Sequence, residues 1–255
     1  MPSLKEKLAD PTYIINMQMN VIPSPVVTQA LAAAGTDAVM IDMEHGAVGH
    51  AEAHAMIAAT QGTDCSPLVR IPEINDAHVK RVMDLGAEGI VFPLVRTADD
   101  ARRAVASLRY PPHGTRGWGP FIAHSRWGGG IMNYVAERGD KSICCLLLET
   151  REAVENAEEI CAVPGIDIAV IAGFDLSSSL GVPGQFTHPD YLAAEKKLET
   201  AILAAGLPMS AVAFTEERAD ELIGRGYRVL AGFDVLWLKS AVAASVSWGK
   251  KPAPK

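Results

Sequence analysis

The sequence predicts an α/β barrel of eight parallel strands with helices between them. Three observations predict this fold: short apolar runs alternate with helical segments, there are eight such runs, and the chain is 255 residues long. Runs that are apolar almost throughout are typical of parallel strands covered on both faces. Eight such units in about 250 residues match a (β/α)8 or TIM barrel, and we expect one domain over residues 1–255.

The expected strands are spread evenly along the chain. A doubly wound sheet would also alternate strands and helices, but the segment after the first strand lacks the glycine-rich phosphate turn of nucleotide-binding sheets. The eight strands are expected at 13–18, 37–42, 67–71, 89–94, 143–149, 167–172, 208–213 and 227–232.

The expected helices carry start and stop signals. Ser24 and Pro25 are typical of a helix start, and Gly35 of its end. Thr97 with Asp100 resembles a capping box. Further helices are expected from an apolar stripe over 153–161, and over 190–205 and 216–223.

Two segments exceed what a minimal barrel needs. The connection over 95–142 is unusually long, and long connections are more often functional or oligomer contacts than idle. The last segment, 235–249, is apolar around most of a helix, so it needs another surface to cover it. We expect that surface to belong to a partner subunit.

Composition excludes several classes of protein. With 23 basic and 30 acidic residues the formal charge is −7, and no basic run is present, so nucleic acid is not an expected partner. Prolines interrupt the longest uncharged stretch, 11–36, which argues against a membrane span. The N-terminus has no signal-peptide core, and the four cysteines form no C-x-x-C pair. We therefore expect a cytoplasmic protein that binds small molecules.

Charged residues lie at the ends of four of the expected strands, where barrels of this kind place their active sites. The second strand ends in Asp42, Glu44 and His45, the third in Arg70 and the fifth in Glu149, and Asp175 follows the sixth.

Glu149 and Asp175 come from neighbouring strands, so two carboxylates would meet at the barrel mouth and repel each other. A divalent cation would relieve that repulsion, and ligation by carboxylates alone favours Mg²⁺ or Mn²⁺. The alternative is a pair of rim carboxylates that bind loop N–H groups or form salt bridges.

Arg70 and His45 are candidates for substrate binding and proton transfer. The planar guanidinium of Arg70 suits a carboxylate or 2-oxo acid, although a structural salt bridge to Glu44 or Glu73 is the alternative. An imidazole is a common general acid or base, and His45 lies beside acids that can orient it. By contrast, Asp84 falls inside the expected helix after the third strand, and its simplest interpretation is an acidic side chain that faces solvent.

Other chemistries lack the residues they need. No lysine falls at a strand end, which disfavours Schiff-base chemistry. The chain has no G-x-S-x-G elbow for serine hydrolysis. His50 and His54 have the spacing of a metal pair, but they lie on an expected outer helix without a third ligand.

Seven segments of the chain carry recognisable motifs: IDMEHG (41–46), VRIPE (69–73), GAEGIVFPLV (86–95), YPPHGTRGWG (110–119), SRWG (125–128), LLET (147–150) and DLSSSLGVPGQFTHP (175–189). In this order and spacing they resemble the HpcH/HpaI class II pyruvate aldolases, which cleave 4-hydroxy-2-oxo acids. The resemblance covers nearly the whole chain.

The resemblance implies an aldehyde-lyase that releases pyruvate and an aldehyde. It implies that Glu149 and Asp175 hold Mg²⁺ or Mn²⁺, with Co²⁺ as a further candidate. Arg70 would bind the pyruvate oxygens, and His45 would be the acid/base, supported by Asp42 and Asp84. The resemblance also implies a homo-hexamer, a trimer of dimers in which the last helix is exchanged between subunits.

The chain departs from the family pattern at three places: NMQMN (16–20) replaces a tryptophan-containing segment, Leu147 replaces a glutamine, and Ala172, Gly173 and Phe174 replace G-P-x before Asp175. Leu147, Gly173 and Phe174 are therefore the expected substrate-contact positions that differ. Two alternative functions remain open: a related lyase or condensing enzyme for a citrate-like or acyl-CoA substrate, and a barrel that binds a 2-oxo acid without turnover.

Overall fold

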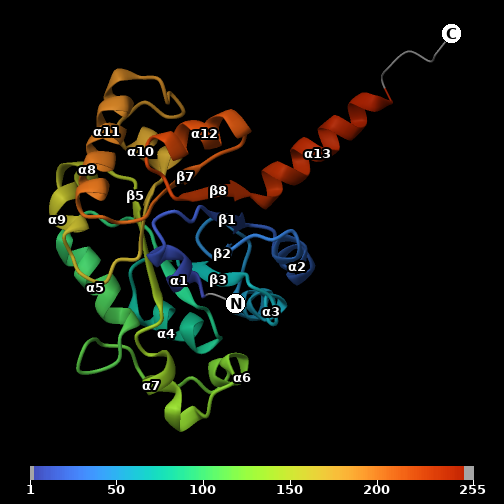
Figure 1. Cartoon of the computed structure of the whole chain (residues 1–255), viewed down its shortest axis with the longest axis vertical. Helices are drawn as coiled ribbons and strands as arrows, with labels where there is room; N and C mark the ends of the chain where they lie inside the picture. The colour runs from blue at the N-terminus through green and yellow to red at the C-terminus, as the bar shows by residue number, and fades with distance from the viewer. Residues whose placement is uncertain (1–2, 250–255) are drawn as a thin grey trace.

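The computed structural model describes residues 3–249 and shows a closed barrel of eight parallel strands (Figure 1). Each strand pairs with its neighbours in chain order, and β8 closes the barrel against β1. This confirms the predicted (β/α)8 fold. The strands are β1 (Ile15–Asn20), β2 (Ala38–Asp42), β3 (Ser66–Arg70), β4 (Gly89–Phe92), β5 (Ile143–Leu148), β6 (Ile168–Ile171), β7 (Met209–Val212) and β8 (Val229–Phe233).

Alternation along the strands divides the core into two layers. In β2, Val39 and Ile41 belong to the cluster between the barrel and its helices, whereas Met40 belongs to the cluster inside the barrel. In β3, Val69 packs outward and Leu68 inward. Because both faces are covered, several strands are apolar almost throughout, and this is the pattern that predicted them.

One end of the barrel interior is closed by the first helix, α1 (Leu4–Ala9). Leu4 and Leu8 join the inner cluster. A capping box between Ser3 and Glu6 begins this helix. The N-terminal end of the barrel is therefore filled by side chains, and the C-terminal ends of the strands form the open end.

The helices between strands begin and end close to the predicted signals. Thr97 and Asp100 form the predicted capping box. The stripe over 153–161 is divided into two short helices, with Asn156 between them. The helices are α2 (Pro25–Ala33), α3 (His50–Ala59), α4 (Asp76–Asp84), α5 (Ala98–Leu108), α8 (Arg151–Glu155), α9 (Ala157–Cys161), α10 (Gly173–Ser179), α11 (Pro189–Ala204) and α12 (Glu216–Gly224).

The long connection after α5 lies at the N-terminal end of the barrel, because it leads from the end of that helix to the start of β5. It contains α6 (Ala123–Trp127), the 3₁₀ turn η1 (Ile131–Asn133) and α7 (Tyr134–Arg138). The buried Arg116 guanidinium lies over two rings, 4.7 Å from the Tyr110 centroid and 6.0 Å from the Tyr134 centroid. This segment is therefore a built structure with a small core of its own.

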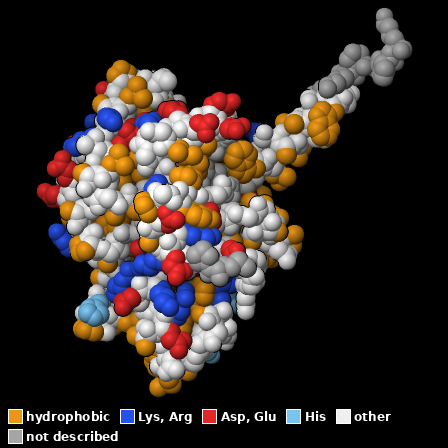
Figure 2. All heavy atoms as spheres, viewed as in Figure 1, with side chains coloured by type: hydrophobic (Ala, Val, Ile, Leu, Met, Phe, Trp, Pro, Cys, Tyr) orange, Lys and Arg blue, Asp and Glu red, His pale blue; other side chains and the backbone are white. Residues whose placement is uncertain are grey.

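The last helix, α13 (Asp234–Trp248), extends away from the barrel (Figure 1). Its exposed side chains include Leu236, Leu238, Val242, Val246 and Trp248. Figure 2 shows these hydrophobic groups along the projecting helix. The predicted apolar helix is thus present, and within one chain most of its surface has no cover. No helix among the described residues has the length and apolar character to cross a membrane.

Candidate active site

The pleat of the strands carries three charged side chains into the open end of the barrel. Met40, Leu68 and Leu147 point into the barrel interior. Successive inward positions are two residues apart, so the next inward residues are Asp42, Arg70 and Glu149. All three are buried.

Asp42 and Arg70 form a two-point ion pair. They are register partners on adjacent strands, and Arg70 donates from Nε to Asp42 Oδ1 at 2.9 Å and from Nη2 to Oδ2 at 2.6 Å. Burial opposes ionisation of Asp42, but the hydrogen bonds and charge of Arg70 outweigh it and lower the pKa of Asp42. The guanidinium plane is therefore fixed at the barrel mouth. The expected salt-bridge partners of Arg70 were Glu44 and Glu73, and Asp42 was not among them. Glu44 does contact Arg70, with 3.3 Å between Oε2 and Nη1.

The loop after β2 is held by the same carboxylate. Asp42 Oδ1 accepts the backbone N–H groups of Glu44 at 3.0 Å and His45 at 3.2 Å. Asp42 therefore positions the backbone that carries His45, while its other contacts orient Arg70. Burial raises the pKa of Glu44 in spite of the nearby Arg70 charge.

Glu149 is the most perturbed carboxyl group of the site. Its Oε1 accepts the Leu94 N–H at 2.6 Å. Burial, assisted by the charges of Asp175 and Glu44, raises the pKa of Glu149 to about 7, although the Leu94 hydrogen bond and Arg70 act in the opposite direction. The charges of Asp175 and Glu44 therefore act on the Glu149 carboxyl group in the same direction as its burial.

Asp175 lies in the first turn of α10, which begins directly after β6. A cavity of about 480 Å³ opens at this end of the barrel. Its lining combines the methionines of β1 and β2 with polar side chains and with three positions at which the chain departs from the family pattern, Leu147, Gly173 and Phe174. The lining also includes Met17, Met19, Asp42, His45, Arg70 and Asp175.

Asp84 is not brought to this cavity within one chain. It is the last residue of α4, a helix whose end leads to the start of β4, so it lies at the opposite end of the barrel. There it forms an ion pair with the buried Arg116 at 3.4 Å, and burial raises the pKa of Asp84. His50 and His54 lie on α3 as expected, and His50 stacks on His78.

One contact of the site had no signal in the sequence. The Leu94 N–H that binds Glu149 depends on a left-handed backbone conformation, with φ 53°, which leucine rarely adopts. Met17 and Met19 belong to the segment 16–20, whose departure from the family pattern the sequence does show, and they line the cavity from β1. Their flexible thioethers give this wall an adaptable apolar surface.

The barrel is closed and parallel, and the carboxyl ends of its strands carry a histidine, the ion pair of Arg70 with Asp42, and further acidic groups. This arrangement is that of a TIM-barrel enzyme. The family model described as HpcH/HpaI aldolase/citrate lyase matches residues 22–241. The chain therefore belongs to the HpcH/HpaI aldolase/citrate lyase family.

Similar proteins narrow the activity to an aldolase. The chain is 35% identical to 2-dehydro-3,6-dideoxy-6-sulfogluconate aldolase from Pseudomonas putida, over 82% of this chain and 81% of that protein. It is 33% identical to hydroxypyruvate/pyruvate aldolase from Chromohalobacter salexigens, over 86% and 87% of the two chains. The HpcH/HpaI aldolase structure from Desulfitobacterium hafniense DCB-2 superimposes with a TM-score of 0.90 at 31% identity, covering 99% of each chain. The protein is a class II aldolase, a carbon–carbon lyase.

Proposed function

We propose that this aldolase reversibly cleaves 4-hydroxy-2-oxo acids to pyruvate and an aldehyde with the help of a divalent cation. The observation that carries the proposal is the convergence of His45, the fixed Arg70 and Asp175 on one cavity, with the buried Glu149 close enough to respond to Asp175. A site of this composition binds a small acid and stabilises negative charge that develops on it.

Glu149 and Asp175 are the groups that would hold the cation. Among residues 3–249, no three His, Cys, Asp or Glu side chains are grouped so as to hold a metal by themselves. Two carboxylates fit Mg²⁺, which commonly keeps waters and uses one or two protein carboxylates together with substrate oxygens; Mn²⁺ and Co²⁺ are further candidates. The raised pKa of Glu149 supports this fit, because a cation would compensate the buried charge. The cation would supply Lewis-acid stabilisation of the enolate charge.

The chain's own residues bind the acid and move the proton. Arg70 would bind the pyruvate oxygens with the N–H groups that Asp42 does not occupy. In cleavage, His45 takes the proton from the 4-hydroxyl as the C3–C4 bond breaks, and the electron pair becomes the pyruvate enolate. Asp42 keeps Arg70 and the His45 backbone in place. Leu147, Gly173 and Phe174 line the space beside these groups and are the proposed substrate contacts.

The proposed assembly is a homo-hexamer, a trimer of dimers that exchanges the last helix. The exposed apolar side chains of α13 support an exchange, because a second copy would cover them. Asp84 would then support His45 only from a second copy, since within one chain it lies at the other end of the barrel. The hexameric number rests on the family resemblance.

We place the reaction in the cytoplasm. The four cysteines are free and buried, and burial raises the pKa of Cys65 to about 12. Buried, unreactive thiols are compatible with a reducing compartment.

The test is the exchange of the pyruvate methyl protons with D₂O, followed by NMR with Mg²⁺ or Mn²⁺ present. We expect exchange that stops on chelation and in the double variant Glu149→Ala with Asp175→Ala, and pyruvate release from 4-hydroxy-2-oxo acids under the same conditions. Full exchange in the double variant would refute the roles of the two carboxylates. Activity confined to acyl thioesters would favour the condensing enzyme, and pyruvate binding without exchange would favour a non-catalytic barrel.

A further inference from the structure

A second cavity of about 500 Å³ adjoins the one that contains His45 and Arg70. Ile171, Gly173, Phe174 and Val212 line both cavities, so the two share a wall at the open end of β6 and β7. The second cavity contains none of the groups proposed to bind the cation, bind pyruvate or move the proton. Because the two share a wall, the second cavity lies directly beside a molecule bound in the first.

The side of this cavity nearest to the first is aromatic. Phe174, Phe186, Tyr191 and Phe214 line it. Phe186 meets Phe174 and Tyr191 edge to face, with ring centroids 5.5 Å apart in both pairs. Phe174, Phe186 and Phe214 remain 51%, 40% and 36% exposed, so their ring surfaces are available for contact. Aromatic groups arranged in this way favour a further ring over a flexible polar chain.

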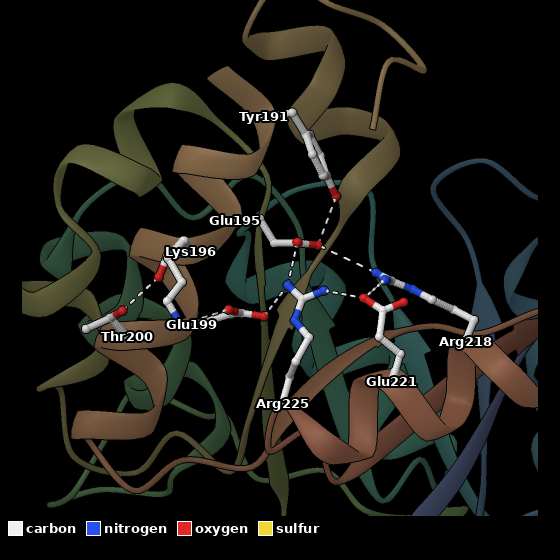
Figure 3. A network of polar contacts seen from close by, with 8 residues as sticks. All are labelled: Tyr191, Glu195, Lys196, Glu199, Thr200, Arg218, Glu221 and Arg225. Atoms are coloured by element: carbon white, nitrogen blue, oxygen red, sulfur yellow. Dashed lines mark hydrogen bonds and ion pairs between the residues drawn. The ribbon is translucent and has the colours of Figure 1, made fainter. Parts of the chain in front are cut away.

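The far side of the cavity is charged but internally paired. Arg218 binds Glu221 at 2.7 Å, and Arg225 binds Glu195 at 2.5 Å (Figure 3). Arg225 also contacts Glu221 and the buried Glu199. Each guanidinium therefore already contacts carboxylates, and an incoming anion would face those carboxylates. This arrangement rejects a ligand with an anionic tail.

We propose that the second cavity receives the substituent of the aldehyde partner and selects an uncharged aromatic group. The inference rests on the proposed function. In the synthetic direction, the enolate carbon of pyruvate bonds to the aldehyde carbon, and the aldehyde oxygen gains a proton to become the 4-hydroxyl. The substituent on that carbon then lies across Phe174, against Phe186 and Phe214.

The geometry also explains why Gly173 is small. A Cβ at this position would lie 2.6 Å from Tyr191 Oη and 3.7 Å from the Phe186 ring. The absence of a side chain lets Tyr191 and Phe186 approach the shared wall. Gly173 thus keeps the aromatic side of the second cavity next to the site of bond formation.

The test compares aldol addition of pyruvate to benzaldehyde, acetaldehyde and 4-formylbenzoate. We expect kcat/KM for benzaldehyde to exceed that for each of the others by about 10-fold or more, the size of effect that a hydrophobic pocket gives. Phe186→Ala and Phe214→Ala should each reduce this preference several-fold, whereas Phe121→Ala, an exposed ring on the long connection, should not. If an alanine variant fails to fold, Phe186→Leu provides the same comparison.

Deuterium exchange of pyruvate separates the two possible failures, because it needs no aldehyde. Exchange together with equal kcat/KM for the three aldehydes, or a preference for 4-formylbenzoate, would overturn this inference and leave the proposed function standing. Lack of exchange would overturn the proposed function and the inference with it. Exchange with a benzaldehyde preference that survives both Phe→Ala changes would also overturn it, because the preference would arise elsewhere.

Discussion

The backbone N–H of Leu94 donates to Glu149 Oε1 at 2.6 Å, and Leu94 adopts a left-handed conformation to do so. A non-glycine residue held in that region costs of order 1 kcal/mol and persists where its surroundings enforce it. Here the connection after β4 points a donor at one oxygen of a buried carboxylate. The contact fixes one oxygen of Glu149. Its other oxygen, Oε2, accepts no hydrogen bond from the described residues.

The raised pKa of Glu149 predicts how cation binding depends on pH. Burial raises this pKa to about 7, so below pH 7 a cation must displace a proton from the carboxyl group. We expect affinity for Mn²⁺ to rise about tenfold per pH unit up to about pH 7 and then to level off. Calorimetry between pH 5.5 and 8.5 measures this dependence. Glu149→Gln is the matched control, which should bind weakly with a flat profile; an equally steep profile in that variant would contradict the assignment.

The contact between Glu44 and Arg70 predicts how Glu44 affects acid binding. The Glu44 carboxylate lies 3.3 Å from Arg70 Nη1. It therefore competes with the carboxylate of an incoming acid for the Arg70 guanidinium. We expect Glu44→Gln to lower the Kd for pyruvate by about 3–10-fold, because removing a nearby like charge is worth about 1 kcal/mol at a partly screened site. Calorimetric titration with pyruvate checks this. Glu73→Gln, which changes an exposed carboxylate in the loop after β3, should bind pyruvate as the wild type does.

Asp234 predicts how firmly the last helix is attached to the barrel. This buried carboxylate accepts the N–H groups of Val21 and Ile22 and the Asn20 side chain, at 3.2, 3.0 and 2.8 Å. Asp234→Ala would leave these donors unpaired, and we expect a loss of about 1–3 kcal/mol in the free energy of unfolding. Urea unfolding measures the loss, and light scattering should show a weakened oligomer. Asp220→Ala, an exposed acid on α12, is the control; equal effects in both variants would exclude a specific role for Asp234.

The fold could be predicted because the strand signal depends only on local composition. All eight strands lie within a few residues of their predicted positions. Alternation fixes which residues point inward at the strand ends, namely Asp42, Arg70 and Glu149. His45 and Asp175 come shortly after β2 and β6 and line the same cavity as Arg70. Asp84 shows the limit of such reasoning, because the proposed support for His45 from a second copy of the chain leaves no pattern in the sequence of one chain. Phe186 and Phe214 were missed for a related reason. They lie in connections after α10 and β7, where no periodicity indicates which side chains converge.

Gly46 tests whether the loop that carries His45 must keep its present path. A Cβ there would lie 2.3 Å from the Asp42 carbonyl oxygen and 3.2 Å from that of Val21, and both obstacles are backbone atoms that cannot rotate away. We therefore expect Gly46→Ala to displace the loop and to lower kcat by about 100-fold, the cost of a misplacement of about 1 Å. The barrel itself should remain folded, because the obstruction is confined to the end of β2.

Gly130→Ala is the matched control, because its Cβ would meet nothing within 4 Å and its backbone is not left-handed. Kinetics of pyruvate release and circular dichroism, measured on both variants, separate an effect on the site from an effect on the fold. If Gly46→Ala retained the kcat of Gly130→Ala, the loop could move without loss. His45 would then not depend on the position that Asp42 gives its backbone, and its role as the acid/base would need another source of orientation.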